Sequence, residues 1–267
     1  MYFVGIDLAW SPKNRTGIAV LAGTRKKAEL VSCTTVLADE EIVQYIRDHV
    51  GNAPAFVGID APLIVPNQQG RRVAEEITGM LFRKYNAGAH PANRERLGAW
   101  SGGKIRGEEL TKLLEKEGFV HNPDTKAFEQ SRKVFEVYPH PSMVVLFNLE
   151  RVIPYKNKPG RDQESRWQAF ATYQKHMCGL AKARPTLVLP DNVAKRNVRE
   201  LIGKKLKDYE DTLDAVFCAY VAQYAWARPQ DCAVLGNMRE GYIFTPVFGS
   251  MHQQLKGIAS QRSLGDF

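Results

Sequence analysis

The residues best suited to chemistry end two copies of one pentapeptide. Phe-Val-Gly-Ile-Asp occurs at 3–7 and again at 56–60 of this 267-residue chain. Each copy is a short apolar run, typical of a buried strand, that closes with Asp7 or Asp60. An ionised carboxylate there is costly to bury unless a cation or hydrogen-bond donors compensate it. One such aspartate is most simply a turn cap, but two in identical context indicate a shared cation site.

Three further acids are candidates to join this pair. Asp211 and Asp214 are three residues apart and therefore lie on one face of an expected helix. The helix dipole explains acids in a first turn, which accounts well for Asp211 and less well for Asp214 among apolar neighbours. Glu136 lies midway along the strand-like segment 133–138, and a solvent-facing position is an equal alternative for it.

Carboxylates that converge without basic partners repel one another, and divalent cations resolve this repulsion. Oxygen-only ligands suit Mg²⁺ or Mn²⁺. Two such ions about 4 Å apart activate a water and stabilise the leaving oxygen of a phosphodiester. The expected chemistry is therefore metal-dependent phosphodiester hydrolysis. The candidate metal ligands are Asp7, Asp60, Glu136, Asp211 and Asp214.

Other side chains are candidates for supporting roles. His140, in the expected rigid turn 138–141, could assist proton transfer to the leaving group, although a turn histidine with a satisfied hydrogen bond is the alternative. Trp10 and Trp100 could stack bases or simply pack in the core or a lid. Candidates to hold phosphates, for each of which an ordinary surface charge is the simpler explanation, are Arg72, His90, Lys156, Arg161 and Arg166.

The elements that must position these residues follow from the hydrophobic pattern. Expected strands at 2–7, 16–22 and 29–36 form an antiparallel meander. A helix with acids in its first turn, from residue 38 to Gly51, then leads into the second pentapeptide strand at 55–60. This strand–helix–strand crossover makes the two pentapeptide strands parallel neighbours, so both aspartates reach the carboxyl edge where α/β sheets bind ligands.

The rest of the chain completes a single expected domain, 1–267. Residues 66–132 are rich in Gly, Pro and charge, and we expect a basic insertion of helix and loop over one end of the sheet. Strand 133–138 follows, then mixed helix and loop over 148–207. Apolar residues at helical spacing predict a long helix at 207–228, and 240–245 is a candidate last strand.

Charge and composition narrow the class of partner. The net charge of +8 and isoelectric point near 9.3 favour a polyanion such as nucleic acid, with an unspecialised basic surface as the alternative. The N-terminus lacks a basic leader, and the longest apolar stretch, 215–227, is too short to cross a bilayer. The four cysteines show no metal-finger spacing. We therefore expect a cytoplasmic protein with no membrane partner.

Taken together, the motifs resemble the ribonuclease-H-like superfamily. More narrowly, the chain is similar to the family catalogued as domain of unknown function 429, described as predicted ribonuclease-H-like nucleases. The matching stretches are GIDLAW with NRTGIAVL, VGIDAPL, VFEVYPHPSMVVLF, IPYK, DTLDAVFCAYVA and EGYIFTP. The resemblance implies a mixed five-stranded α/β sheet in the order 3-2-1-4-5 with strand 2 antiparallel, flanked by helices and with a helical insertion after strand 4. It also implies that Asp7, Asp60 and Asp214 are metal ligands, with Glu136 or Asp211 completing the site.

Two other functions fit parts of the sequence. An actin-like phosphotransferase or ATPase also begins with a Gly-x-Asp strand, but loop 9–15 lacks the glycines and hydroxyls that wrap a phosphate. A non-catalytic nucleic-acid-binding protein on the same fold would need no metal ion at all. A metal-dependent nuclease remains the leading prediction.

Overall fold

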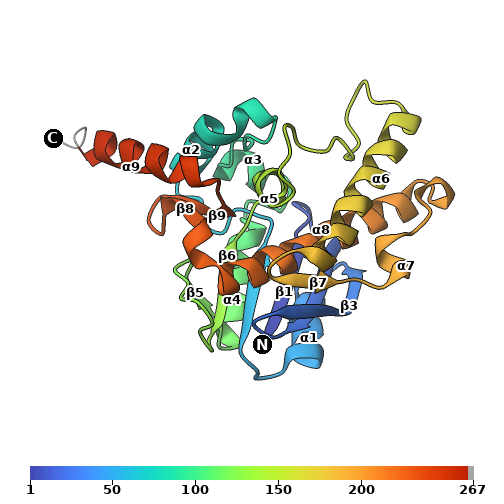
Figure 1. The fold of residues 1–267 in the computed structure, drawn as a ribbon. Helices are drawn as coiled ribbons and strands as arrows, with labels where there is room; N and C mark the ends of the chain where they lie inside the picture. Colours follow the sequence, from blue (N-terminus) through green and yellow to red (C-terminus); the bar gives the residue numbers. More distant parts are fainter. Residues whose placement is uncertain (264–267) are drawn as a thin grey trace.

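A seven-stranded mixed sheet forms the centre of the computed structural model, which describes residues 1–263 (Figure 1). Its strands are β1 (Tyr2–Asp7), β2 (Thr16–Gly23), β3 (Lys27–Val36), β4 (Ala55–Ile59), β5 (Val120–His121), β6 (Arg132–Glu136) and β7 (Thr186–Val188). The strand order is β5-β6-β4-β1-β2-β3-β7. β2 pairs antiparallel with β1 and with β3, whereas all the other neighbouring strands are parallel.

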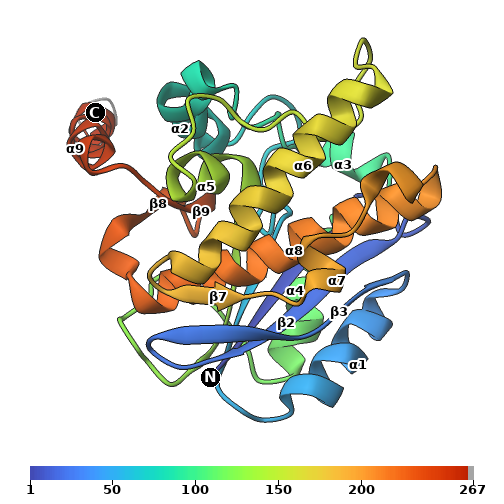
Figure 2. The ribbon, with the colours of Figure 1, turned by 45° about the vertical axis from the view of Figure 1, so that its right-hand side comes forward.

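Helices cover both faces of the sheet. They are α1 (Asp39–Val50), α2 (Val73–Phe82), α3 (Arg94–Gly98), α4 (Arg106–Lys116), α5 (Pro139–Leu146), α6 (Gln163–Gly179), α7 (Asp191–Ala194), α8 (Lys204–Ala227) and α9 (Gly249–Ser263). α8 and α6 share one apolar core with the sheet, and α1 and α4 share a second core on the other face (Figure 2). None of the helices in the described part of the chain is long and apolar enough to span a membrane.

A two-stranded hairpin and two helices gather at the end of the sheet away from the N-terminus (Figure 1). The hairpin consists of β8 (Cys232–Asn237) and β9 (Gly241–Pro246). It packs with α2 and α5 in a third, smaller apolar cluster. Residues of this cluster line one side of a cavity at the edge of the sheet where β1, β4 and β6 end.

The meander, the crossover and the long late helix are confirmed. The five predicted strands lie in the expected order as β3-β2-β1-β4-β6, but β5 and β7 extend the sheet at its two edges. β5 lies in the segment predicted to contain only helix and loop. It has two residues and β7 has three, which is too short for an alternating pattern to show. α8 begins three residues earlier than predicted, and the predicted strand after residue 133 ends at Glu136.

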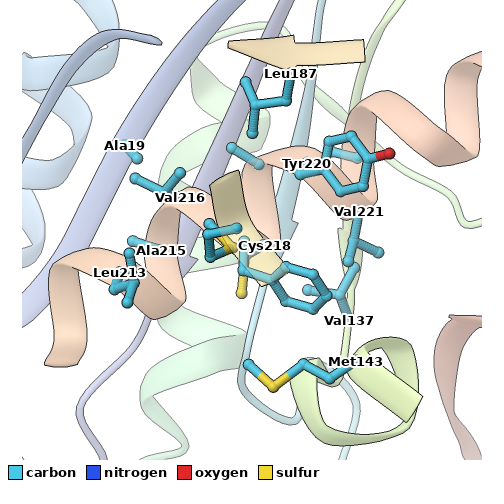
Figure 3. Close-up of a cluster of buried hydrophobic side chains, with 14 of the residues drawn as sticks. Ala19, Val137, Met143, Leu187, Leu213, Ala215, Val216, Cys218, Tyr220 and Val221 are labelled. Carbon is cyan, nitrogen blue, oxygen red and sulfur yellow. The ribbon is translucent and has the colours of Figure 1, made fainter. Parts of the chain in front are cut away.

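Two glycines explain why α8 can lie so close to the sheet. Gly5 of β1 is in register with Gly58 of β4, so the repeated pentapeptides lie side by side. A Cβ atom at Gly5 would come within 1.9 Å of the Ala215 carbonyl oxygen and 2.2 Å of the Ala219 nitrogen. Figure 3 shows the small and branched side chains that α8 turns toward the sheet, among them Ala215 and Val216. The missing side chain at Gly5 therefore sets the separation between helix and strand.

We expect Gly5→Ala to destabilise the fold severely, because the new methyl group meets helix backbone that cannot rotate away. The cost should be about 3 kcal/mol or more, at the upper end of overpacking substitutions. The matched change Gly58→Ala should cost less, since its nearest backbone contact would be 3.1 Å, to the Cys218 carbonyl oxygen. Urea unfolding of both variants measures the difference, and equal stabilities would contradict this account.

Candidate active site

Asp7 and Asp60 lie at the carboxyl ends of two neighbouring parallel strands. Asp7 is the last residue of β1, and Asp60 directly follows β4. The Asp60 N–H donates to the Ile6 carbonyl across 2.8 Å, which continues the strand pairing up to the site. Both side chains line a cavity of about 300 Å³. Neither carboxylate accepts a hydrogen bond or forms an ion pair with any described residue.

The electrostatics of the pair favour a cation. Burial raises the pKa of the Asp7 carboxyl, with repulsion from Asp214 adding to the effect and Lys156 opposing it. Burial together with the charge of Asp7 raises the pKa of Asp60 well above its ordinary value. Two neighbouring carboxylates that are costly to ionise gain the most when a positive charge is brought to them.

Asp214 lies beneath this pair on α8 and is fully buried. Its Oδ1 accepts hydrogen bonds from the hydroxyls of Tyr155 at 2.7 Å and Tyr173 at 3.2 Å. Its Oδ2 lies 2.9 Å from Nζ of Lys156. The structure thus brings Asp214 to the predicted place but engages both of its oxygens with partners from the chain.

Lys156 is the counter-ion of the site. It comes from the segment between α5 and α6 and lines the same cavity as Asp7 and Asp60. Burial alone would lower the pKa of its ammonium, but the charges of Asp214, Asp7 and Asp60 together raise this pKa well above the ordinary value. The sequence pattern indicated a phosphate ligand here, and the neighbouring Tyr155 was the signal that the segment enters the core.

Glu136 and Arg72, two other predicted site residues, bind each other. Two Arg72 nitrogens donate to the Glu136 carboxylate at 2.6 and 2.9 Å, and the Leu63 N–H donates at 2.9 Å. Arg72 also pairs with Glu75 at 2.6 Å, donates to the Ile64 carbonyl, and is only 2% exposed. These contacts occupy the carboxylate oxygens of Glu136, which a metal ion would need, and the guanidinium nitrogens of Arg72, which a phosphate would need. Neither residue is therefore part of the proposed site.

Asp211 faces a different cavity from Asp60. Its Oδ1 lies 2.5 Å from Nζ of Lys207, and with Asp7 it lines a neighbouring cavity of about 730 Å³. Burial and the nearby charge of Asp7 raise the pKa of Asp211 to about 8. Asp211 therefore lies next to the site, on the far side of Asp7 from Asp60. Its carboxylate is already paired with the ammonium of Lys207.

The predicted phosphate ligands Arg161 and Arg166 hold the segment that carries Lys156. Arg161 donates to the carbonyls of Pro154 at 3.0 Å and Lys156 at 2.8 Å. Arg166 donates to the Tyr155 carbonyl at 3.0 Å and pairs with Glu210 at 2.9 Å. Both guanidinium groups therefore fix backbone on either side of the lysine.

His140 lines the cavity, but the expected rigid turn is instead the first turn of α5. Its Nδ1 lies 3.2 Å from the Tyr138 hydroxyl. Burial and the nearby charge of Lys156 lower the pKa of the imidazole to about 3. An imidazole with so low a pKa is neutral and a weak base, so the structure favours the alternative of a histidine with a satisfied hydrogen bond over the predicted proton transfer to a leaving group.

The residues of the site are better suited to a divalent ion that keeps some of its waters than to an ion held by protein ligands alone. Within residues 1–263, no group of three or more His, Cys, Asp and Glu side chains is arranged to hold a metal ion. Mg²⁺ in proteins usually keeps several waters and binds one or two carboxylates together with substrate phosphates. Asp7 and Asp60, which have free oxygens facing a cavity, meet that requirement.

Fold and site together define an α/β protein with an acidic cavity at the carboxyl ends of two parallel strands. The chain belongs to the family described as "Protein of unknown function (DUF429)", which it matches over residues 5–238. The family resemblance seen in the motifs is thereby confirmed. A search among curated proteins found no match.

The contact between Arg72 and Glu136 predicts how strongly Arg72 contributes to the free energy of unfolding. Arg72→Met should destabilise the fold by about 3–5 kcal/mol, because it leaves two buried carboxylates, Glu75 and Glu136, without their counter-ion. The neighbouring exposed Arg71→Met is the matched control and should change little. Chemical denaturation of the two variants decides, and a cost below about 1 kcal/mol for Arg72→Met, the range of a surface pair, would contradict a buried network.

Proposed function

We propose that this protein hydrolyses phosphodiester bonds in nucleic acid with the aid of a divalent metal, Mg²⁺ or Mn²⁺, held by Asp7 and Asp60. The observation that carries the proposal is the pair of carboxylates without partners among the described residues, at the floor of a cavity. When bound, such an ion polarises a phosphoryl oxygen and lowers the pKa of a water.

The surroundings of the pair support a polymeric anion as substrate. The cavity of about 300 Å³ shares Asp7 and Trp10 with the one of about 730 Å³. On its other side it shares His90 and Lys158 with one of about 800 Å³. Basic side chains along this row, with Asp208 and Asp211 between them, are Lys13, Arg15, Lys204, Lys207, Arg151, Lys158 and Arg161. A row of this length suits a strand of several nucleotides better than a small phosphoester.

The topology supports a place in the ribonuclease-H-like superfamily. The order β3-β2-β1-β4-β6 with β2 antiparallel is the order that the resemblance implies. Acidic residues at the ends of β1 and β4 and on α8 occupy the corresponding places. A nuclease of this class would take its substrate across the carboxyl edge of the sheet, where the three cavities lie.

The first test is removal of the proposed ligands. Asp7→Asn and Asp60→Asn should each lower cleavage of labelled DNA and RNA by about 100-fold or more in Mg²⁺ or Mn²⁺, because the ion supplies several kcal/mol to the transition state. Both variants should stay folded, since neither carboxylate supports a described contact. Asp48→Asn, exposed on α1, is the control.

Full cleavage by both site variants would overturn the proposal. Binding of nucleic acid in EDTA, without cleavage in any metal, would favour the non-catalytic alternative. Saturable binding of ATP with Mg²⁺ in calorimetry would favour the actin-like alternative, because a nuclease has no need of such a site.

The second test concerns the tryptophans beside Asp7. Trp10 and Trp100 are 39% and 57% exposed and line the same cavity as Asp7. If they stack on bases, Trp100→Ala and Trp10→Ala should each weaken binding of a single-stranded oligonucleotide by about 5- to 100-fold, the value of one aromatic stack. Fluorescence anisotropy in EDTA measures binding without cleavage. Met80→Ala, at a more exposed apolar position on α2, should leave affinity unchanged.

A further inference from the structure

The partly buried lysine of the site changes the expected number of metal ions. Resting on the function proposed above, we infer that Lys156 supplies the second positive charge of the site, so that the protein binds one divalent ion and not two. In this arrangement Asp214 is the anchor of the lysine and not a metal ligand.

The contacts of Asp214 are those of a residue that holds an ammonium group. One oxygen accepts from two tyrosine hydroxyls, at 2.7 and 3.2 Å, and the other lies 2.9 Å from Nζ of Lys156. Tyr155, Tyr173 and Asp214 are all fully buried. For Asp214 to bind an ion through its second oxygen, that oxygen would have to give up the lysine.

The backbone around Lys156 is fixed independently of its ammonium group. Arg161 donates to the carbonyls of Pro154 and Lys156, and Arg166 donates to the carbonyl of Tyr155. Arg166 is itself tied to Glu210 on α8. The lysine is therefore positioned before any ion or substrate arrives, as an electrostatic catalytic group must be.

The count of charges agrees with a single ion. Three carboxylates, those of Asp7, Asp60 and Asp214, surround the ammonium of Lys156. One ammonium and one divalent ion balance these three negative charges, whereas a second divalent ion would leave an excess of positive charge. Of the flanking acids, Asp211 is paired with Lys207, whereas Glu136 shares the single charge of Arg72 with Glu75, so this count applies to the three carboxylates around Lys156.

The position of Lys156 also gives it access to substrate. It lines both the cavity that contains Asp7 and Asp60 and the adjoining cavity of about 800 Å³. A phosphate bound to an ion between the two aspartates would present another oxygen toward the ammonium. A charge-assisted hydrogen bond there would stabilise the negative charge that develops during phosphoryl transfer.

The test is the number of Mn²⁺ ions bound per chain, measured by calorimetry on wild type, Lys156→Met, Lys156→Arg and Lys158→Met. Wild type should bind one ion. Lys156→Met, which frees Asp214, should bind two, and electron paramagnetic resonance should show the two ions coupled. Lys156→Arg keeps the positive charge and should bind one. Lys158→Met, an exposed lysine of the same cavity, should also bind one.

Two ions in wild type, or one ion in a folded Lys156→Met, would overturn the inference and leave the proposed function intact. If Lys156→Met does not fold, wild type and Lys156→Arg decide the matter, because both must bind a single uncoupled ion. Absence of Mn²⁺ binding by every folded variant would overturn the proposed function itself. Measured without substrate, the stoichiometry depends on no assay of cleavage.

Discussion

The close approach of α8 to β1 is the constraint on which the site depends. Because Gly5 has no side chain, the helix backbone at Ala215 lies almost against the strand. The next residue toward the helix N-terminus is Asp214, which is thereby placed under the strand ends that carry Asp7 and Asp60. The packing that stabilises the core thus also forces three carboxylates together, and a positive charge must then be supplied among them.

The protein supplies positive charge to most of these acids and leaves two of them without a partner. Acids at the edges of the site have their own cations, Arg72 for Glu136 and Lys207 for Asp211. Asp214 has Lys156 and two tyrosine hydroxyls. Only Asp7 and Asp60, among the described acids of the site, face the cavity without a partner. The carboxylates of the site that are free to bind a cation are therefore those of Asp7 and Asp60.

Sequence alone could locate this pair because its signal is local. Apolar alternation, a glycine and a terminal aspartate specify a buried strand and its end, and the crossover rule makes the two strands neighbours. The partners of the other acids could not be found this way, since Arg72 and Glu136 are 64 residues apart and meet only in the folded chain. The same limit applies to Lys156, whose charge suggested phosphate binding until its buried partner Asp214 was placed.

If the site binds metal as proposed, the fixed ammonium has a consequence for that binding. A lysine held by the fold is present at full occupancy at all times, whereas an ion must be captured from solution. Its charge opposes that of the incoming ion, so Asp7 and Asp60 should bind metal more weakly than three free carboxylates would. On the proposed function, a substrate phosphate that contacts both the ion and Lys156 would offset this repulsion, because it attracts both. On the proposed function, metal and nucleic acid should accordingly strengthen each other's binding, which would tie assembly of the site to the presence of substrate.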